Sequence, residues 1–123
     1  MTNILIYNLS PKKDSELKML CRKLNLSAET VDKSDYGLTL EALFGFTEEK
    51  TRRDGEDFDD EMLYIAGVQG GMLDIFLDQL RRKKLTVPLK AVMTQTNLSF
   101  TSYELHKELC AEREAIAKGM QAH

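Results

Sequence analysis

The sequence contains little cysteine. Its 123 residues include only two cysteines, Cys21 and Cys110, each among apolar residues at helical spacing. A secreted domain of this size that depends on disulfides normally carries more cysteines, and a structural zinc site needs four ligands at close spacings that are absent from this chain. We therefore expect two reduced, buried thiols in a cytoplasmic protein, with no bound metal and no cofactor.

Long hydrophobic runs and an excess of basic residues are also absent. The segment from Met1 to Asn8 has no basic region, and no stretch of the chain approaches about 20 apolar residues, so neither a signal peptide nor a membrane span is expected. Lys and Arg total 17 against 20 Asp and Glu, which gives a net charge of −3. Nucleic-acid-binding domains usually carry a basic stripe, so we expect neither nucleic acid nor membrane as a partner.

Histidine is nearly as scarce, which limits the possible chemistry. His106 and Cys110 are four residues apart on one predicted helix face, a spacing that suits a metal or a thiol and imidazole pair. No third ligand and no orienting acid is evident nearby in the sequence, and His123 lies in a C-terminal tail that we expect to fray. The sequence predicts no catalytic residue and no metal ligand, so an enzyme is not favoured.

The chain does contain alternating strand and helix patterns. Continuous apolar runs predict buried strands at 4–7 and 62–66, a last strand is predicted at 89–93 after Pro88, and a weaker pattern predicts an edge strand at 28–32. Apolar residues at helical spacing predict helices over 11–25, 39–44, the region of 73–80, and from 101 onward. Three of the predicted helices begin with N-cap residues: Ser10 before Pro11, Thr39, and Thr101, which forms a capping box with Glu104.

This alternation predicts an α/β fold. We expect a small three-layer sandwich with a four-stranded, mainly parallel sheet of order 2-1-3-4, similar to a truncated flavodoxin-like fold. A ferredoxin-like antiparallel sheet is the rival, but it needs neighbouring strands without an intervening helix, and no such pair is visible. The length suits a single domain spanning residues 1–123, and no internal repeat is apparent.

One polar segment interrupts the pattern. Residues 46–61 contain eight acidic residues against three basic ones, and we expect a poorly ordered loop that Phe58 fixes to the rest of the protein. The acidic residues lack the spacing of a calcium loop, so a solvated acidic surface is the favoured interpretation. Lys90 lies inside a predicted strand, where it either faces solvent at a sheet edge or pairs with a carboxylate of this loop.

Polar residues follow the predicted strands and form the candidate site. In an open parallel sheet, ligands bind at the carboxyl ends of the strands where the strand order reverses, here between the first and third strands. The residues expected to bind a ligand there are Asn8, Ser10, Gly67, Gln69, Gly70, Gly71, Thr94, Thr96 and Asn97. The glycine-rich turn suits an anion, or is simply a tight turn that needs positive φ. The threonine-rich turn either contacts a ligand or satisfies its own backbone.

Several motifs together resemble a known family. They are Asp35-Tyr36-Gly37, Leu43-Phe44-Gly45, Phe58 to Met62, Lys90 to Thr94, Thr96-Asn97, Thr101 and Tyr103-Glu104-Leu105. This set resembles a family of small bacterial proteins that is catalogued only as a domain of unknown function. The chain departs from the pattern at Phe100, where the family often has Trp. The resemblance implies one intact bacterial domain and brings no activity, cofactor or site residue with it.

The residues therefore favour a non-enzymatic binding or regulatory module. Its partner is expected to be a protein or a small molecule, and a homodimer through an outer helix or an edge strand is one possibility. The alternative is a protein or enzyme that binds a small anionic ligand at the carboxyl ends of the strands.

Overall fold

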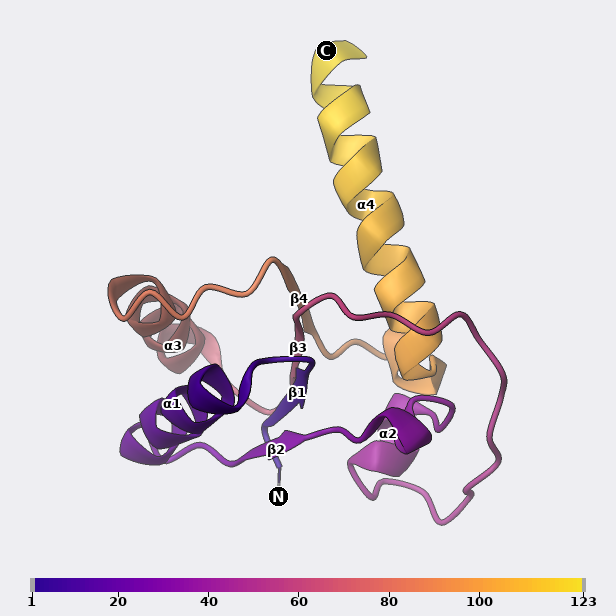
Figure 1. The fold of residues 1–123 in the computed structure, drawn as a ribbon, viewed down its shortest axis with the longest axis horizontal. Coiled ribbons are helices and arrows are strands. Elements are labelled where there is room, and N and C mark those ends of the chain that lie inside the picture. The colour runs from indigo at the N-terminus through magenta and orange to yellow at the C-terminus, as the bar shows by residue number, and fades with distance from the viewer. Residues whose placement is uncertain (1, 123) are drawn as a thin grey trace. The chain divides into compact units, whose positions relative to one another are not determined.

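A computed structural model describes the backbone of residues 2–122 and the side chains up to Lys118. His123 and the side chains beyond Lys118, which belong to the tail expected to fray, lie outside these described residues. The elements, in chain order, are β1 (Ile4–Tyr7), α1 (Pro11–Lys23), β2 (Ala28–Thr30), η1 (Lys33–Asp35), α2 (Leu40–Leu43), β3 (Met62–Ile65), α3 (Gly70–Arg82), β4 (Leu89–Val92), η2 (Asn97–Ser99) and α4 (Ser102–Ala122) (Figure 1). Among the described residues, no helix is both long and apolar enough to cross a membrane.

The chain divides into two compact units. The first unit combines residues 1–33 with 59–93 and contains the whole sheet, α1 and α3. The second unit combines residues 34–58 with 94–123 and contains α2, α4 and most of the acidic segment. Each unit is therefore built from two stretches that are distant in the sequence.

The sheet of the first unit has the expected order, β2-β1-β3-β4, and two of its three strand pairs are parallel. The predicted α/β class with a mainly parallel four-stranded sheet is confirmed. The central pair differs from the prediction, because β1 and β3 are antiparallel, with Ile4 opposite Ile65 and Tyr7 opposite Met62. Only short helices of three and four residues lie between β2 and β3, so no crossover helix fixes the direction of β3.

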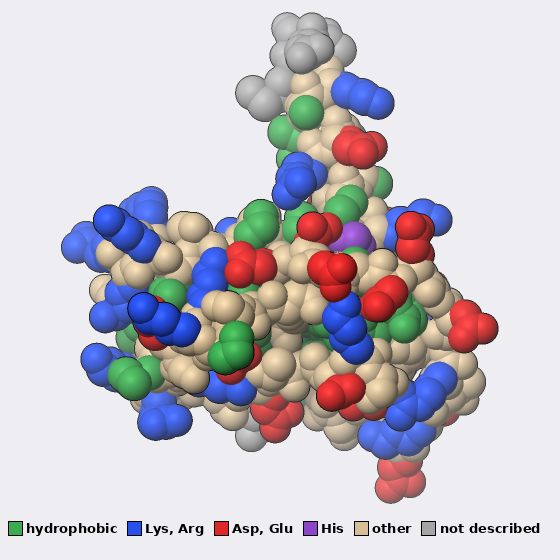
Figure 2. All heavy atoms as spheres, viewed as in Figure 1, with side chains coloured by type: hydrophobic (Ala, Val, Ile, Leu, Met, Phe, Trp, Pro, Cys, Tyr) green, Lys and Arg blue, Asp and Glu red, His purple; other side chains and the backbone are tan. Residues whose placement is uncertain are grey.

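The direction of β3 also decides where the helices lie. In this unit α1 and α3 lie side by side and pack on the same face of the sheet, where Ile4 and Ile6 meet Leu63 and Ile65 (Figure 1). Right-handed crossovers from β1 to β2 and from β3 to β4 put both helices on one face, because strand direction and direction of travel are both reversed. The first unit by itself thus has two layers. Its Lys and Arg side chains gather over these helices (Figure 2).

The first unit contains a structural repeat that the sequence does not reveal. Each half is a four-residue strand, a 13-residue helix and a parallel strand. Both helices end in the same Schellman turn: Leu26 N–H donates to Cys21 O and Leu85 N–H to Leu80 O, each at 2.8 Å. The residues that follow the helix caps, Asn25 and Lys84, have φ of 62° and 57°. The two halves share this geometry without sharing an evident sequence motif.

The second unit is held by backbone contacts between its two stretches. Thr39 and Thr101 form an antiparallel bridge, Leu40 N–H donates to Phe100 O at 2.8 Å, and Ser102 N–H donates to Tyr36 O at 3.1 Å. The predicted cap of α2 is confirmed, since the Thr39 side chain accepts from the backbone of the helix. These contacts hold the first turn of α2 beside the first turn of α4.

Candidate functional site

Helix α4 is the element on which the candidate site of the second unit is built, and its start is firmly fixed. Thr101 N–H donates to Glu104 Oε1 at 2.8 Å, and Glu104 N–H donates to Thr101 Oγ1 at 3.2 Å. This reciprocal pair confirms the predicted capping box. The bond from Thr101, followed by the bond from Arg53 at 2.5 Å, holds the pKa of the Glu104 carboxyl below its ordinary value.

The acidic segment runs against α4, and its position depends on a glycine. A Cβ added at Gly55 would lie 2.4 Å from Cγ of Tyr103, which is closer than any real side chain approaches. The segment is also tied by its backbone, because Arg53 N–H donates to Gly37 O at 2.9 Å. The segment therefore contacts its own unit at Arg53 and Gly55, although most of its residues are exposed and it contains no helix or strand.

Phe58 is the last residue of this segment that belongs to the second unit, and it is buried, with 6% of its surface exposed. Its ring stacks on Tyr36 at 4.9 Å between centroids and on the imidazole of His106 at 4.0 Å. The predicted role of Phe58 as an anchor of the loop is confirmed. The same contact fixes the plane of the only histidine among the described residues.

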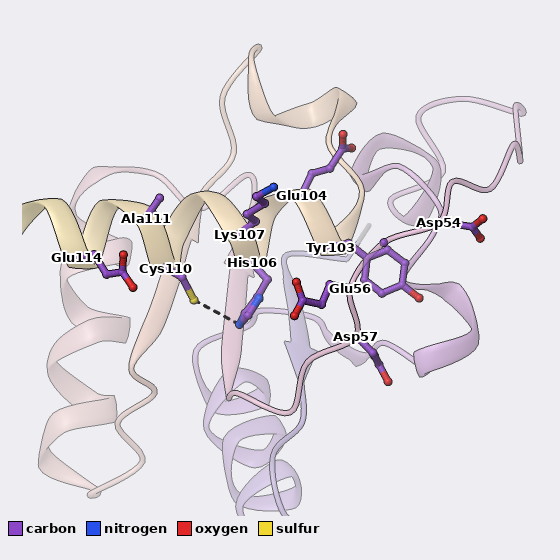
Figure 3. Close-up of a pocket in the computed structure, with 11 residues that line it drawn as sticks. Asp54, Glu56, Asp57, Tyr103, Glu104, His106, Lys107, Cys110, Ala111 and Glu114 are labelled. Carbon is purple, nitrogen blue, oxygen red and sulfur yellow. Dashed lines mark hydrogen bonds between the residues drawn. The ribbon is translucent and has the colours of Figure 1, made fainter.

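A cavity of about 540 Å³ opens between the acidic segment and α4 (Figure 3). Within it, His106 Nε2 and Cys110 Sγ lie 3.4 Å apart. The cavity is lined by Asp54, Gly55, Glu56, Asp57, Tyr103, Glu104, His106, Lys107, Cys110, Ala111 and Glu114. Figure 3 shows His106, Cys110 and Glu114 along one side of α4, with Glu56 reaching toward them from the opposite segment. The cavity thus presents a thiol and an imidazole among several carboxylates.

Beyond the cavity, α4 continues without cover. Every residue from 111 to 118 is exposed, and Ile116 exposes 61% of its surface. The helix face that begins with buried Leu105 continues through half-buried Leu109 to Ile116, because these positions follow helical spacing. Glu112 and Arg113 lie between Leu109 and Ile116 on this face, and among the described residues neither has an ion-pair partner.

The structure does not bring the predicted crevice residues of the first unit together. Asn8 and Ser10 follow β1, whereas Gly67 to Gly71 follow β3, and the antiparallel pairing puts these strand ends at opposite edges of the sheet. Ser10 caps α1 by accepting from Lys13 N, and Asn8 Nδ2 donates to Asp60 O at 3.1 Å. Both side chains therefore already have hydrogen-bond partners within the first unit.

The two turns predicted to bind a ligand, 67–71 and 94–97, belong to different units. In the first unit, Gly67 has a φ of 70°, and Gln69, Gly70 and Gly71 form the start of α3. In the second unit, Thr94 N–H donates to Asn97 Oδ1 at 2.9 Å and Asn97 N–H donates to Thr94 Oγ1 at 3.1 Å. Thr96 precedes η2 and accepts from Ser99 through its backbone. These bonds agree with the alternative interpretation of each segment, a turn that satisfies itself.

Lys90 and Cys21 have local explanations in the first unit. Lys90 lies on the edge strand β4 and donates to Val87 O at 2.6 Å. Cys21 is buried in the α1 core, and burial raises the pKa of its thiol to about 11. Both thiols are reduced, as expected, but Cys110 is only partly buried, so the expectation of two buried thiols is wrong for Cys110. Sequence reasoning identified the spacing of His106 and Cys110 but not the cavity around them, because the opposite wall comes from residues about 50 positions earlier in the chain.

Comparison with known proteins identifies a family for part of the chain. Residues 61–116 match the family model described as Domain of unknown function (DUF3783), which confirms the expected resemblance over this stretch. The motifs quoted above for residues 35–60 lie outside the match. No curated protein and no solved structure matches the chain significantly. The match begins at Glu61, the last residue of the acidic segment, and covers the second repeat of the sheet and most of α4.

Proposed function

We propose that this protein is a non-enzymatic interaction module that pairs with a second copy of itself through α4. The observation that carries the proposal is the helix face formed by half-buried Leu109 and by exposed Glu112, Arg113 and Ile116. Helix α4 extends beyond the other elements of its unit (Figure 1). An exposed apolar side chain on such a helix is a common feature of helix-mediated association. The two reduced thiols and the family resemblance support a cytoplasmic bacterial protein as part of the same proposal.

The face is complementary to itself. Its positions are i, i+3, i+4 and i+7, so all four side chains lie on one side of the helix. When two such helices pack antiparallel about an axis between Glu112 and Arg113, Leu109 of each copy meets Ile116 of the other. In the same arrangement each Glu112 meets an Arg113. A twofold interface requires this kind of self-complementary patch, in which residue i contacts j and j contacts i.

The small size of the face predicts weak association. Two helices that touch over two turns bury much less than the roughly 1,200 Å² of a stable interface, so a concentration-dependent equilibrium between monomer and dimer is expected. The charge pairs add specificity and register more than affinity. A transient dimer of this kind suits a regulatory module.

Sedimentation velocity over a concentration series tests the proposal. The 14.0 kDa chain should shift toward twice that mass as the concentration rises. Ile116→Asp, Glu112→Arg and Arg113→Glu should each weaken the dimer, because the single charge reversals bring like charges together. The double variant Glu112→Arg/Arg113→Glu restores both pairs and should recover association.

Lys118→Glu is the matched control for the charge reversals. Lys118 is exposed on the same helix but points away from the proposed face. This variant should associate like the original chain. A chain that stays monomeric throughout the series, or a dimer that none of the face variants weakens, would reject the proposal. Circular dichroism of each variant confirms that α4 is retained.

A further inference from the structure

We infer that the cavity of the second unit binds a thiophilic divalent cation of the Zn²⁺ class, held by Cys110 Sγ, His106 Nε2 and the carboxylate of Glu114. The three residues recur every fourth position along α4 and line the same cavity (Figure 3). This site lies on a different side of α4 from the proposed dimer face, and the inference does not depend on dimerisation.

The separation of the two strongest ligands fits a single metal ion. Zinc binds cysteine sulfur at about 2.3 Å and histidine nitrogen at about 2.0 to 2.1 Å, with tetrahedral geometry. Two such bonds at a tetrahedral angle span about 3.5 Å between sulfur and nitrogen. The observed distance between Cys110 Sγ and His106 Nε2 is 3.4 Å. The separation of these two atoms is therefore the one that a single metal ion bound to both requires.

The ring of His106 is oriented before any metal arrives. Phe58 stacks on it at 4.0 Å between centroids with 5° between the planes, and Phe58 is itself buried. A metal-binding histidine needs such support, because a freely rotating ring loses conformational freedom on binding. Phe58 is therefore a positioning residue for the site.

Carboxylates complete the ligand set. Glu114 follows Cys110 by one helical turn, and among the described residues its carboxylate has no ion-pair partner. Its oxygens do not lie within 4.8 Å of both the Cys110 and the His106 ligand atoms, so the exposed Glu114 side chain must rotate to reach the ion. Glu56 approaches from the opposite wall and is similarly without one (Figure 3). Carboxylate oxygen is an established zinc ligand alongside thiolate and imidazole. With three protein ligands, the fourth position is left to Glu56 or to water.

Binding requires a defined change of protonation. The Cys110 thiol loses its proton to solvent as the sulfur to metal bond forms, so each metal ion bound releases one proton. The Glu114 carboxylate and the neutral imidazole bind through lone pairs. No oxidation or reduction is involved.

Titration of the reduced, full-length protein with Co²⁺ and then Zn²⁺ tests the inference. Cobalt should produce a thiolate-to-metal charge-transfer band at one equivalent per chain, and Zn²⁺ should abolish that band. A lightly buffered sample with a pH indicator should report about one proton released per metal ion. A metal bound only by surface carboxylates gives neither the band nor the proton, and that result would overturn the inference.

Substitutions assign the ligands. Cys110→Ser keeps the size of the side chain and should remove the charge-transfer band while weakening Co²⁺ binding at least about 100-fold. His106→Gln should also weaken binding strongly, and Glu114→Gln should weaken it about 10-fold. Glu108→Gln makes the same charge change on another face of α4, outside the cavity, and should leave affinity unchanged. If Cys110→Ser retains the band, the thiolate ligand is not Cys110 and the assignment is wrong.

Discussion

The imidazole of His106 lies flat against the ring of Phe58, with 4.0 Å between the centroids and 5° between the planes. This contact joins the end of the acidic segment to α4 inside the second unit. It buries Phe58 and leaves the Nε2 edge of the imidazole facing the thiol of Cys110. Phe58 therefore anchors the acidic segment to its unit, although most residues of the segment are exposed and it contains no regular secondary structure.

Phe58→Ala should remove a large part of the stability of the second unit. Truncating a buried phenylalanine costs about 3 to 5 kcal/mol, because apolar contacts are lost and a cavity remains. Phe46→Ala is the matched control: Phe46 is 47% exposed, so its loss should cost about 1 kcal/mol or less. Urea unfolding followed by circular dichroism measures both. Equal losses for the two variants would show that Phe58 does not anchor the segment.

Glu104 should make folding stability depend on pH. Its folded pKa lies below the ordinary value of 4.5, first because of the Thr101 N–H and then because of Arg53. The unfolded state therefore takes up the proton first as pH falls, so this stabilisation is complete above pH 4.5 and is lost as pH falls through the folded pKa. Glu104→Gln keeps an oxygen for the cap but not the charge, and should cost about 0.5 to 1 kcal/mol at pH 7.

The comparison of Glu104→Gln with the original chain should be made across pH. The difference in free energy of unfolding should be constant from pH 7 to about pH 5 and shrink below that. Glu108→Gln, on the same helix but with no hydrogen bond among the described residues, should show little difference at any pH. A Glu104→Gln difference that persists unchanged at the lowest pH would show that the carboxylate charge plays no part.

Gly55 should be intolerant of even a methyl group. The added Cβ of Gly55→Ala would lie 2.4 Å from the Tyr103 ring, so the segment must move, at a cost of about 1 to 3 kcal/mol. Gly71→Ala is the matched control, because Gly71 lies in α3 with open space around its Cβ position. There the substitution should stabilise by about 0.5 to 1 kcal/mol. Thermal unfolding distinguishes the two, and effects of the same sign would count against this packing.

The two thiols should differ sharply in reactivity. Cys21 is 1% exposed, and burial raises its pKa to about 11, so almost no thiolate is present or accessible at pH 8. Cys110 is partly exposed and opens into the cavity. Ellman's reagent should therefore titrate one thiol in the native protein and two after denaturation, and Cys110→Ser should eliminate the native reaction. Rapid labelling of Cys21 in the folded chain would contradict the buried core.

Local patterns predicted most elements but not their directions. The apolar runs of β1 and β3 and the caps at Ser10, Thr39 and Thr101 have local causes, so they are readable from the sequence. The antiparallel pairing of β1 with β3 is not local, because a continuous apolar strand carries no mark of its direction. Only short helices lie between β2 and β3, and a crossover helix would be longer. The lack of a long helical pattern there is the sequence feature that could have indicated an antiparallel pairing of β1 with β3.

The candidate site was likewise predictable only where it depends on residues close together in the sequence. The four-residue spacing of His106 and Cys110 is visible in the sequence, whereas the stacking of Phe58 joins residues 48 positions apart. The face of Leu109, Glu112, Arg113 and Ile116 is also readable from spacing alone. Its significance depends on exposure, which the structure supplies and a sequence pattern does not.

The most direct test of pairing through α4 mixes two charge variants. Glu112→Arg carries two basic residues at the centre of the face, and Arg113→Glu carries two acidic ones. Each variant alone should be monomeric, because like charges meet across the axis, whereas an equimolar mixture should form a heterodimer with both ion pairs restored. Native mass spectrometry distinguishes the two chains by mass. A mixture with no heterodimer, or variants that each remain dimeric alone, would contradict the proposed interface.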